Sequence, residues 1–353
     1  MKDIEILGNA QKGDNFIKKI KKKNFLFSFV ISYTETCEIP GITVAGEHPD
    51  LIKYTPPADA EFLHYGHCKS INVVPMTPDG QPTPAILTKV ALEAASIPSI
   101  VVNAGSKIPP KLPCIDLGLK PGKNIALEPA LDNESIRKAI EYGRIIGRFL
   151  GSSTDCLVIG ESIPGGTTTA LGVLKGLGIN ASVSSSMPKN PTSLKNEIVT
   201  TALKRTQSRD PFDIVAQLGD PMIPSVAGIL STASESTNVI LGGGTQMAAV
   251  LAFAKNTGFN EDNVAIGTTS YIIDDKSANL IETISQIADI PVLAAKLKLG
   301  QSGISGLRSY EEGFVKEGVG AGGTSIACML KVGLNSENLL SLTEKEYQRI
   351  TLQ

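Results

Sequence analysis

The chain has 353 residues, of which 42% are apolar, so one large α/β domain with an accessory lobe, or two domains, could build a sizeable core. A formal net charge of -2 gives no reason to expect a nucleic-acid or membrane partner bound through bulk charge. The five cysteines are odd in number, scattered and never spaced as C-x-x-C, so we expect reduced thiols and a cytoplasmic location.

The first predicted elements are a lysine-rich helix face and a buried strand. Residues 18–23 carry the lysines, and an apolar run follows over residues 25–31. This order superficially resembles a signal peptide, but Thr34, Glu35 and Thr36 follow the run where small residues would mark a cleavage site. The apolar run therefore predicts a strand, and no run in the chain reaches the about 18 apolar residues of a membrane-spanning helix.

A long section rich in proline, glycine and acidic residues follows over residues 38–66, and we expect it to be irregular because its prolines interrupt helices. Long loops of this kind often carry function, and the role of residues 38–68 stays open. His64, His67 and Cys68 form an H-x-x-H-C cluster that could bind a metal. A second ligand pair at recognisable spacing is missing, so we favour packing and loop hydrogen bonds and expect no metal.

The middle of the chain alternates between short apolar runs and amphipathic segments. The predicted strands cover residues 71–75, 99–102, 156–159, 181–183, 214–218, 238–241 and 263–266, and the predicted helices cover residues 85–95, 133–150, 193–205, 223–231 and 246–253. Strands separated by helices indicate βαβ units. We therefore predict an α/β fold with a doubly wound, mostly parallel, Rossmann-like sheet, whose ligands bind at the carboxyl ends of the strands.

The last part of the chain has a different pattern. From Tyr310 we predict a helix, a glycine-rich break over residues 318–323, a helix over residues 325–332 and a final helix near residues 343–350. These helices either cap the sheet or form a small helical lobe. We predict an α/β nucleotide-binding core over residues 24–309 and a lobe formed by residues 1–23 and 310–353.

The most informative stretch reads GESIPGGTTTAL and begins at Gly160. It joins a predicted strand to a predicted helix, so its backbone N–H groups and threonine hydroxyls can bind a phosphate at the positive end of a helix dipole. Gly160, Gly165 and Thr167 match the P-loop pattern, but Gly166 takes the place of its lysine. ATP or GTP hydrolysis is thus disfavoured. An ordinary glycine-rich strand-to-helix turn is the alternative interpretation.

Two further loops compete for a ligand. One spans residues 316–324, and the other consists of Gly242, Gly243, Gly244 and Thr245. As a dinucleotide fingerprint the second loop lacks the third glycine, because Met247 holds that position, and no acidic residue ends a strand about 20 residues further on. A dinucleotide-dependent dehydrogenase is therefore disfavoured, and we expect no cofactor.

Three segments, GESIPGGTTTAL, GGGTQMAAVLAF and EGVGAGGTSIACML, occur in the same order as three segments of the nicotinate-nucleotide-dimethylbenzimidazole phosphoribosyltransferases. The resemblance covers roughly residues 150–335 and is closest to the archaeal branch of that family. It implies that the chain moves the ribose 5-phosphate of nicotinate mononucleotide to a benzimidazole-type base. The products are nicotinate and the α-ribazole 5-phosphate of the cobalamin lower ligand.

The resemblance also assigns residues. The positions that agree with the family's phosphate motif are Gly160, Glu161, Gly165, Thr167 and Thr168, and those that depart are Ser162, Ile163, Pro164 and Gly166. Glu317 matches the catalytic glutamate, with Val319 in place of a threonine, and Lys195 resembles a phosphate-contacting lysine. The family's methionine at the position of Ser162 lines the base pocket, so the acceptor base stays open.

In the implied reaction a ring nitrogen of the base attacks C1′ and nicotinate leaves, while Glu317 removes the proton from the opposite nitrogen, a step worth about 10² to 10⁴ in rate. We expect Gly165, Gly166, Thr167, Thr168, Lys195 and the loop from Gly242 to Thr245 to bind the substrate and its phosphate, and Glu161 to position substrate or loop. The family also implies a homodimer. The alternatives are a nucleotide-binding regulatory protein without turnover, and a transferase that uses another benzimidazole, a purine or a phenol.

Overall fold

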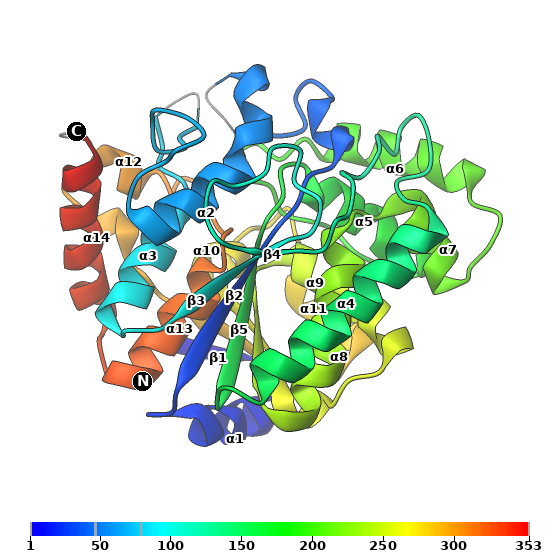
Figure 1. Ribbon diagram of the computed structural model, residues 1–353. Coiled ribbons are helices and arrows are strands. Elements are labelled where there is room, and N and C mark those ends of the chain that lie inside the picture. Colours follow the sequence, from blue (N-terminus) through cyan, green and yellow to red (C-terminus); the bar gives the residue numbers. More distant parts are fainter. Residues whose placement is uncertain (1, 46–47, 78–79, 352–353) are drawn as a thin grey trace.

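The computed structural model describes residues 2–45, 48–77 and 80–351, and within them an eight-stranded sheet has helices on both faces (Figure 1). The strand order is β1-β8-β7-β6-β5-β2-β3-β4. The strands run parallel except that β1 pairs antiparallel with β8. The predicted α/β class with a mostly parallel sheet is confirmed.

The strands are β1 (Ile4–Leu7), β2 (Phe25–Ile31), β3 (Ser99–Asn103), β4 (Ile115–Asp116), β5 (Cys156–Ser162), β6 (Asn238–Gly242), β7 (Val264–Thr269) and β8 (Val292–Ala295). The α-helices are α1 (Ala10–Ile20), α2 (Thr55–Tyr65), α3 (Ala85–Ala94), α4 (Asn133–Gly151), α5 (Gly166–Gly176), α6 (Thr192–Arg205), α7 (Pro211–Leu218), α8 (Met222–Ser236), α9 (Thr245–Thr257), α10 (Ser270–Ile273), α11 (Leu280–Ile287), α12 (Ser305–Arg308), α13 (Ala321–Val332) and α14 (Ser336–Thr351). Short 3-10 helices are η1 (Glu35–Glu38), η2 (Pro49–Tyr54), η3 (Glu261–Asn263) and η4 (Leu299–Gln301).

The direction of winding reverses between β2 and β5, which lie side by side in the centre of the sheet. From β2 the chain goes on to β3 on one side, and from β5 it goes on to β6 on the other side. Both strands end at the upper edge of the sheet in Figure 1. Open α/β sheets bind ligands in the crevice at such a switch point, outside the carboxyl ends of the strands.

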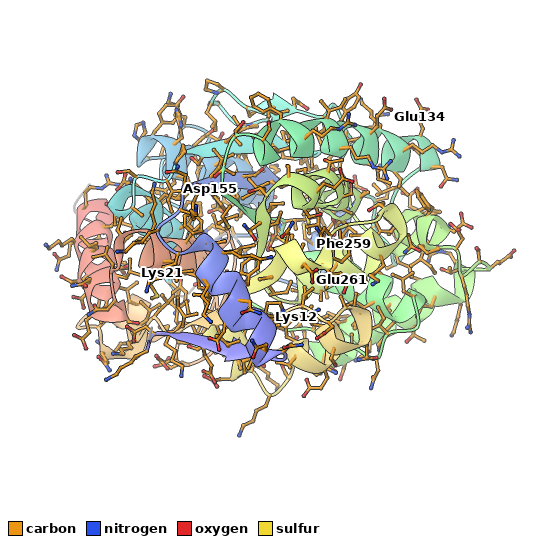
Figure 2. All side chains as sticks on the ribbon, turned by 90° about the horizontal axis from the view of Figure 1, so that it is seen from below. Lys12, Lys21, Glu134, Asp155, Phe259 and Glu261 are labelled. Carbon is orange, nitrogen blue, oxygen red and sulfur yellow. The ribbon has the colours of Figure 1, made fainter. Side chains whose placement is uncertain are left out.

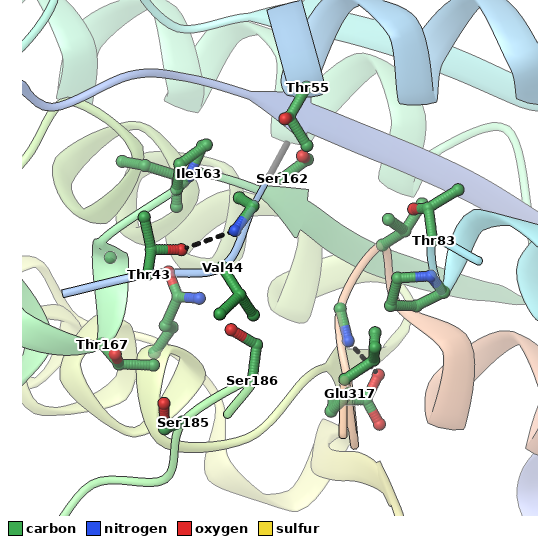
Figure 3. A pocket seen from close by; sticks show the side chains of 18 of the residues that line it. Thr43, Val44, Thr55, Thr83, Ser162, Ile163, Thr167, Ser185, Ser186 and Glu317 are labelled. Carbon is green, nitrogen blue, oxygen red and sulfur yellow. Dashed lines mark hydrogen bonds between the residues drawn. The ribbon is translucent and has the colours of Figure 1, made fainter. Parts of the chain in front are cut away.

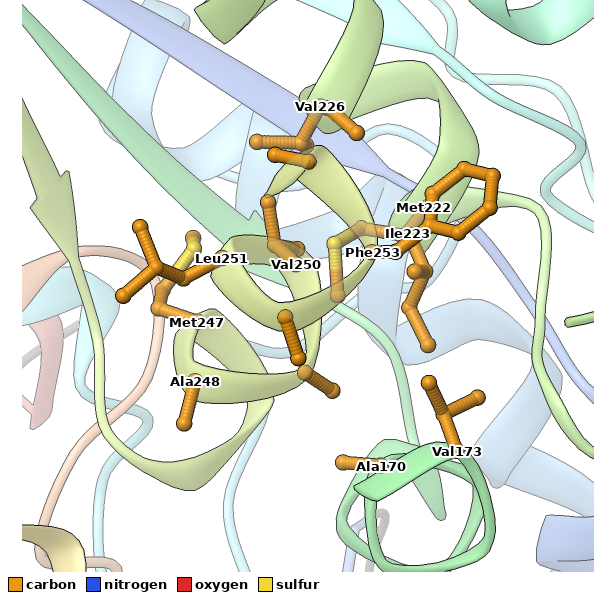
Figure 4. Packing of buried hydrophobic residues seen from close by; sticks show 14 of the residues in the cluster. Ala170, Val173, Met222, Ile223, Val226, Met247, Ala248, Val250, Leu251 and Phe253 are labelled. Carbon is orange, nitrogen blue, oxygen red and sulfur yellow. The ribbon is translucent and has the colours of Figure 1, made fainter. Parts of the chain in front are cut away.

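The apolar core lies in two layers, one on each face of the sheet. One layer contains side chains of α4, α5, α8 and α9, and Figure 4 shows Val226 and Met222 of α8 meeting Val250 and Phe253 of α9. The other layer contains α1, α3 and α13. Every residue of β5 is buried, as expected for a central parallel strand covered on both faces.

The glycines of α4 allow this helix to pack closely against α8. A Cβ atom on Gly143 would lie 2.5 Å from the carbonyl oxygen of Ser225 in α8, and one on Gly147 would lie 2.3 Å from that of Ile229. The backbones of α4 and α8 therefore touch directly.

Three predicted strands are wrong. Residues 71–73 form bends, and residues 74–75 and 181–183 have no regular secondary structure. Residues 214–218 belong to α7, because Asp210 caps that helix by accepting hydrogen bonds from the N–H groups of Phe212 and Asp213, with Pro211 in its first turn. In addition, β1, β4 and β8 were not among the predicted strands.

Two other expectations need correction. Residues 55–65 of the section predicted to be irregular form α2, because prolines in the first turn of a helix start it rather than interrupt it. Residues 46–47 of that section lie outside the described residues. The helix predicted from Tyr310 is also absent from the described structure: turns follow α12 there, and α13 begins at Ala321.

The chain ends contribute to both the sheet and its helical layers. β1 forms an edge of the sheet, and α1 crosses its lower end, with Lys12 and Lys21 visible from below in Figure 2. Lys18 and Lys19 are exposed, which confirms a solvated helix face. α13 packs against β7 and α3, and α14 packs on α3. The division into a core and a lobe stays a prediction.

Candidate active site

A pocket opens at the carboxyl ends of β5 and β6, at the switch point of the sheet (Figure 3). Four parts of the chain line most of it: the loop after β5 with the start of α5, the start of α9, residues 184–186, and the segment before α13. Residues 42–45 and 75–77 also line it, together with Thr55 and Asp59 of α2. Segments that lie far apart in the sequence thus share one cavity.

The three glycine-rich motifs meet directly beside this pocket. A Cβ atom on Gly160 would lie 2.8 Å from the Cα atom of Gly320, and one on Gly323 would lie 2.9 Å from the Cα atom of Gly242. Side chains at these positions would push the strands away from α13. The glycines therefore bring the three motifs together, and the contact explains why each motif is rich in glycine.

Neutral donors surround one end of the pocket. Gly165 adopts φ +76° before α5, and Gly166 and Thr167 begin that helix. Ser185 and Thr245 face the same space. Thr245 is 2% exposed, and its hydroxyl has no hydrogen-bond partner in the described structure. Hydroxyl groups at a helix start can hold an anion, because the helix dipole favours negative charge there.

Glu317 lies at the opposite side, held by the backbone. Its Oε2 accepts a hydrogen bond from the N–H of Thr269 at 2.9 Å, its Oε1 accepts one from Gly318 at 3.1 Å, and the N–H of Gly322 lies 3.2 Å from both oxygens. The carboxylate thereby joins the end of β7 to the start of α13. Burial raises the pKa of Glu317 to about 7, although these N–H groups favour the ionised form.

Glu161 near the end of β5 is the second carboxyl group in the pocket. Its Oε1 accepts a hydrogen bond from the side-chain nitrogen of Gln246 at 3.2 Å. Burial, followed by the charge of Glu317, raises the pKa of Glu161 to about 8. Because each carboxyl group disfavours ionisation of the other, the two titrate as a coupled pair.

The backbone around Glu317 is strained. Val315, Lys316 and Val319 have φ values of 60°, 30° and 55°, in the left-handed region that side chains rarely adopt. Contacts before and after Glu317 hold the segment in place. Lys316 forms an ion pair with Asp275 at 3.0 Å, and the N–H of Val319 donates to the backbone oxygen of Glu161 at 2.9 Å. Strain of this kind clusters at functional sites.

Asp59 of α2 is a third carboxyl group in the wall of the pocket. It accepts hydrogen bonds from Thr83 at 2.7 Å and from Ser162 at 2.8 Å. Burial raises the pKa of Asp59 to about 7. No lysine, arginine or histidine is among the described residues that line the pocket.

The pocket brings together most of the residues that the sequence singled out. Those that line it are Glu161, Gly165, Gly166, Thr167, Gly244, Thr245 and Glu317, whereas Thr168, Lys195, Gly242 and Gly243 lie behind the lining. Thr168 is fully buried in α5, and Gly242 packs near Gly320. Gly243 donates its N–H to the carbonyl oxygen of Gly267 at 2.9 Å.

Lys195 is buried in α6 and donates to the carbonyl oxygen of Ser184 at 2.8 Å, so it supports the serine loop from behind. Burial, followed by the charge of Lys316, lowers the pKa of Lys195 to about 7. A direct contact between Lys195 and a phosphate stays a prediction.

Sequence reasoning missed Asp59, Thr83, Gln246 and the serines at 184–186. Asp59 had a detectable signal, because residues 58–62 contain two carboxylates within an otherwise apolar stretch, and all five are buried. The serines had none, since they belong to an unpaired segment whose position depends on the rest of the fold.

The H-x-x-H-C cluster packs around an aromatic ring. The rings of His64 and His67 lie 4.5 Å and 5.8 Å from that of Tyr65, centroid to centroid. Among the residues that the structure describes, no group of three or more histidine, cysteine, aspartate or glutamate side chains is arranged to hold a metal ion.

Comparison with known proteins places the chain in a family. A family model described as phosphoribosyltransferase (DBI_PRT) matches residues 87–301. The chain belongs to this phosphoribosyltransferase family. It is 49% identical to a UPF0284 protein of Archaeoglobus fulgidus over 97% of this chain and 98% of the relative, and 48% identical to one of Sulfurisphaera tokodaii over 92% and 94%. The resemblance found in the three motifs is thereby confirmed.

Solved structures with the same fold include CobT from Thermus thermophilus, with a TM-score of 0.60 and 14% identity over 95% of this chain and 90% of that one. A second is described as nicotinate-nucleotide-dimethylbenzimidazole phosphoribosyltransferase from the same organism, with a TM-score of 0.60, 15% identity and coverage of 94% and 88%. At this identity the likeness concerns the fold. None of the helices in the described ranges is long and apolar enough to cross a membrane.

Proposed function

We propose that this chain transfers the ribose 5-phosphate of nicotinate mononucleotide to a benzimidazole-type base, giving nicotinate and an α-ribazole 5-phosphate for the lower ligand of cobalamin. One observation supports this most: in a member of the phosphoribosyltransferase family, Glu317 and the hydroxyl-rich loop at Gly166 and Thr167 line the same pocket. A ribose phosphate and its base need an anion site and a proton acceptor in one cavity.

In the proposed reaction a lone pair on one ring nitrogen of the base forms a bond to C1′. The bond from C1′ to the pyridinium nitrogen breaks, and its electron pair neutralises the pyridinium as nicotinate leaves. The proton on the other ring nitrogen passes to Glu317, whose pKa of about 7 suits a base that works near neutral pH. Attack from the face opposite the leaving group inverts the configuration from β to α.

The phosphate is proposed to sit among Gly165, Gly166, Thr167 and Thr245, supported by the buried Lys195 behind the serine loop. Several converging neutral donors can replace a cationic side chain at a helix start. Glu161 is proposed to position the substrate, since it lines the same pocket as Glu317 and its side chain is held by a hydrogen bond from Gln246.

A nucleotide-binding regulatory protein without turnover is the second candidate. It is favoured by the backbone N–H groups that already occupy both oxygens of Glu317. Incubation with nicotinate mononucleotide and a panel of bases, with chromatographic detection of free nicotinate, separates the two. Nicotinate release that depends on the added base supports the transferase. Nucleotide binding without release supports the regulator.

We also propose a cytoplasmic homodimer. The cysteines are free thiols, as expected in a reducing compartment. On the outer face of α4, Tyr142, Ile145 and Phe149 are 39%, 56% and 67% exposed, at a spacing that forms one apolar stripe. Glu141, Arg144 and Arg148 adjoin the stripe in the sequence of α4, so charges of both signs lie next to it. Light scattering should give a dimer, and Ile145→Asp should give a monomer. A wild-type mass of one chain at all concentrations would contradict the proposal.

A further inference from the structure

One end of the pocket combines apolar walls with a buried carboxyl group. The walls are formed by Pro75, Met76, Pro84 and Val319. Asp59 is 2% exposed and lies in this wall, where Thr83 donates to one of its oxygens at 2.7 Å and Ser162 donates to the other at 2.8 Å. The close view in Figure 3 shows Thr83 on the same side of the pocket as Glu317, away from Thr167 and Ser185.

Asp59 retains unused hydrogen-bonding capacity. A carboxylate offers about four lone-pair sites, and the two hydroxyl groups occupy two of them. Within the described ranges no salt bridge reaches Asp59. The hydroxyl of Thr55, which also lines the pocket, is buried without a partner in the described structure. Because a buried carboxyl group is costly without further donors and Asp59 lines the pocket, a ligand that donates to its remaining lone pairs would be favoured.

The charge of Asp59 decides which part of the substrates can lie there. The phosphate and the carboxylate of nicotinate mononucleotide are both anionic. The hydrogen bonds from Thr83 and Ser162 favour the charged form of Asp59 against the effect of burial, and a charged Asp59 would repel both anionic groups. The acceptor base has no such charge, and it is planar, so it fits between apolar walls. The phosphate then binds at the other end of the pocket, where Gly166 and Thr167 supply neutral donors.

We propose that Asp59, held by Ser162 and Thr83, selects an acceptor base that carries an N–H or O–H donor on the ring edge away from the attacking nitrogen. This inference rests on the proposed transferase function. It assigns the acceptor to the class of amino- or hydroxyl-bearing benzimidazoles and purines, and it makes an all-alkyl base the poorer substrate. Asp59 acts in specificity and takes no part in bond making.

The test compares two bases of similar size, 5-aminobenzimidazole, which has a donor, and 5-methylbenzimidazole, which has none. With nicotinate mononucleotide at saturation, kcat/KM for the amino base should exceed that for the methyl base by about ten- to one-hundred-fold, the usual effect of a hydrogen bond to a charged group. Asp59→Leu should bring the ratio to about one. Asp59→Asn keeps the side-chain volume and one acceptor oxygen, so the ratio of the two kcat/KM values should fall several-fold in this variant. This variant replaces Asp59→Leu in the test if the Leu variant does not fold.

Glu235→Gln, which alters an exposed carboxylate at the far end of α8, is the matched control and should keep the wild-type ratio. A wild-type ratio of one or less, or an unchanged ratio in the Asp59 variants, would overturn the inference while leaving the transferase intact. If no base releases nicotinate, the proposed function fails instead. In that case calorimetry measures how tightly each base binds to the protein with bound nucleotide. A subsite that selects a donor must bind the amino base more tightly than the methyl base in the wild type and must lose this preference in the Asp59 variants.

Discussion

Replacing Glu317 by glutamine tests the proposed general base, and the structure shows that the change affects more than proton transfer. Each carboxylate oxygen accepts from a different backbone N–H, Thr269 on one side and Gly318 on the other. A glutamine amide presents an oxygen to only one of them. In either orientation its NH₂ group faces an N–H donor, so one buried donor loses its partner.

The expected losses can be estimated separately. An unsatisfied buried donor costs about 1–3 kcal/mol of stability. At an unfolding entropy of about 2.1 cal/mol/K per residue, a chain of 353 residues should then lose about 1–4 °C in Tm. Loss of the proton acceptor should lower turnover by about 10² to 10⁴, or roughly 3–5 kcal/mol in the activation free energy.

The assay is the initial rate of nicotinate release at saturating substrates and 25 °C, with Tm measured on the same samples. Gly143→Ala in α4 is the stability control, because it should lose a similar Tm while Glu317 stays in place. Glu161→Gln is the chemical control: Glu161 accepts its side-chain hydrogen bond from Gln246 through one oxygen, so an amide can preserve that contact. Near-normal turnover of folded Glu317→Gln protein would refute the assignment and make Glu161 the leading candidate.

Three other changes test the site and the fold. Thr167→Val removes a hydroxyl from the proposed phosphate site while keeping the side-chain shape. KM for the nucleotide should therefore rise about tenfold or more in steady-state assays. Thr200→Val, on the exposed face of α6, is the control and should leave KM unchanged. Gly143→Ala places a methyl group 2.5 Å from a carbonyl oxygen of α8 and should cost about 1–3 kcal/mol in denaturant unfolding; Gly303→Ala, which meets no atom within 4 Å, should cost much less. Burial raises the pKa of Asp59, Glu161 and Glu317 to between about 7 and 8, so these groups bind protons more tightly in the folded state than in the unfolded chain. Their protonation therefore stabilises the fold fully below about pH 4, and this contribution is lost as the pH rises through 7 to 8. The free energy of unfolding should therefore fall between about pH 5 and 7, below the range in which the lowered pKa of Lys195 has the opposite effect. Asp59→Asn should reduce that fall by on the order of a few kcal/mol; equal slopes in both proteins would show that Asp59 does not contribute.

The central strands could be predicted because burial on both faces requires unbroken apolar runs. β5, β6 and β7 follow this rule. The same rule failed at Ile214 and Val215, which are equally apolar but lie in a helix capped by Asp210. Local hydrogen bonds at the cap outweighed the strand preference of β-branched residues, and periodicity over five residues cannot separate the two cases.

The site was predictable where it depends on backbone conformation. Gly165 requires a left-handed φ, and Gly160 and Gly320 touch, so glycine marks these positions in the sequence itself. Gly165→Val would accordingly damage the fold as well as the anion site, because a Cβ atom there lies 2.8 Å from Cys37. The stretch over residues 58–62 marks Asp59 as a buried carboxyl group, but that Asp59 and Gln246 meet in one pocket depends on the packing of whole helices, which no local pattern predicts.

The distribution of charge in the pocket follows that of the proposed substrate. Three carboxyl groups line the cavity within the described part of the chain, and the anion end relies on hydroxyl and backbone N–H groups. Nicotinate mononucleotide carries positive charge at its glycosidic nitrogen and negative charge at its phosphate. A lysine beside Glu161 and Glu317 would neutralise them and oppose the positive charge that develops on the acceptor base during attack. Neutral donors at Thr167 and Thr245 hold a phosphate without that effect, so the lysine missing from the P-loop pattern at Gly166 fits a transferase whose chemistry depends on carboxylates.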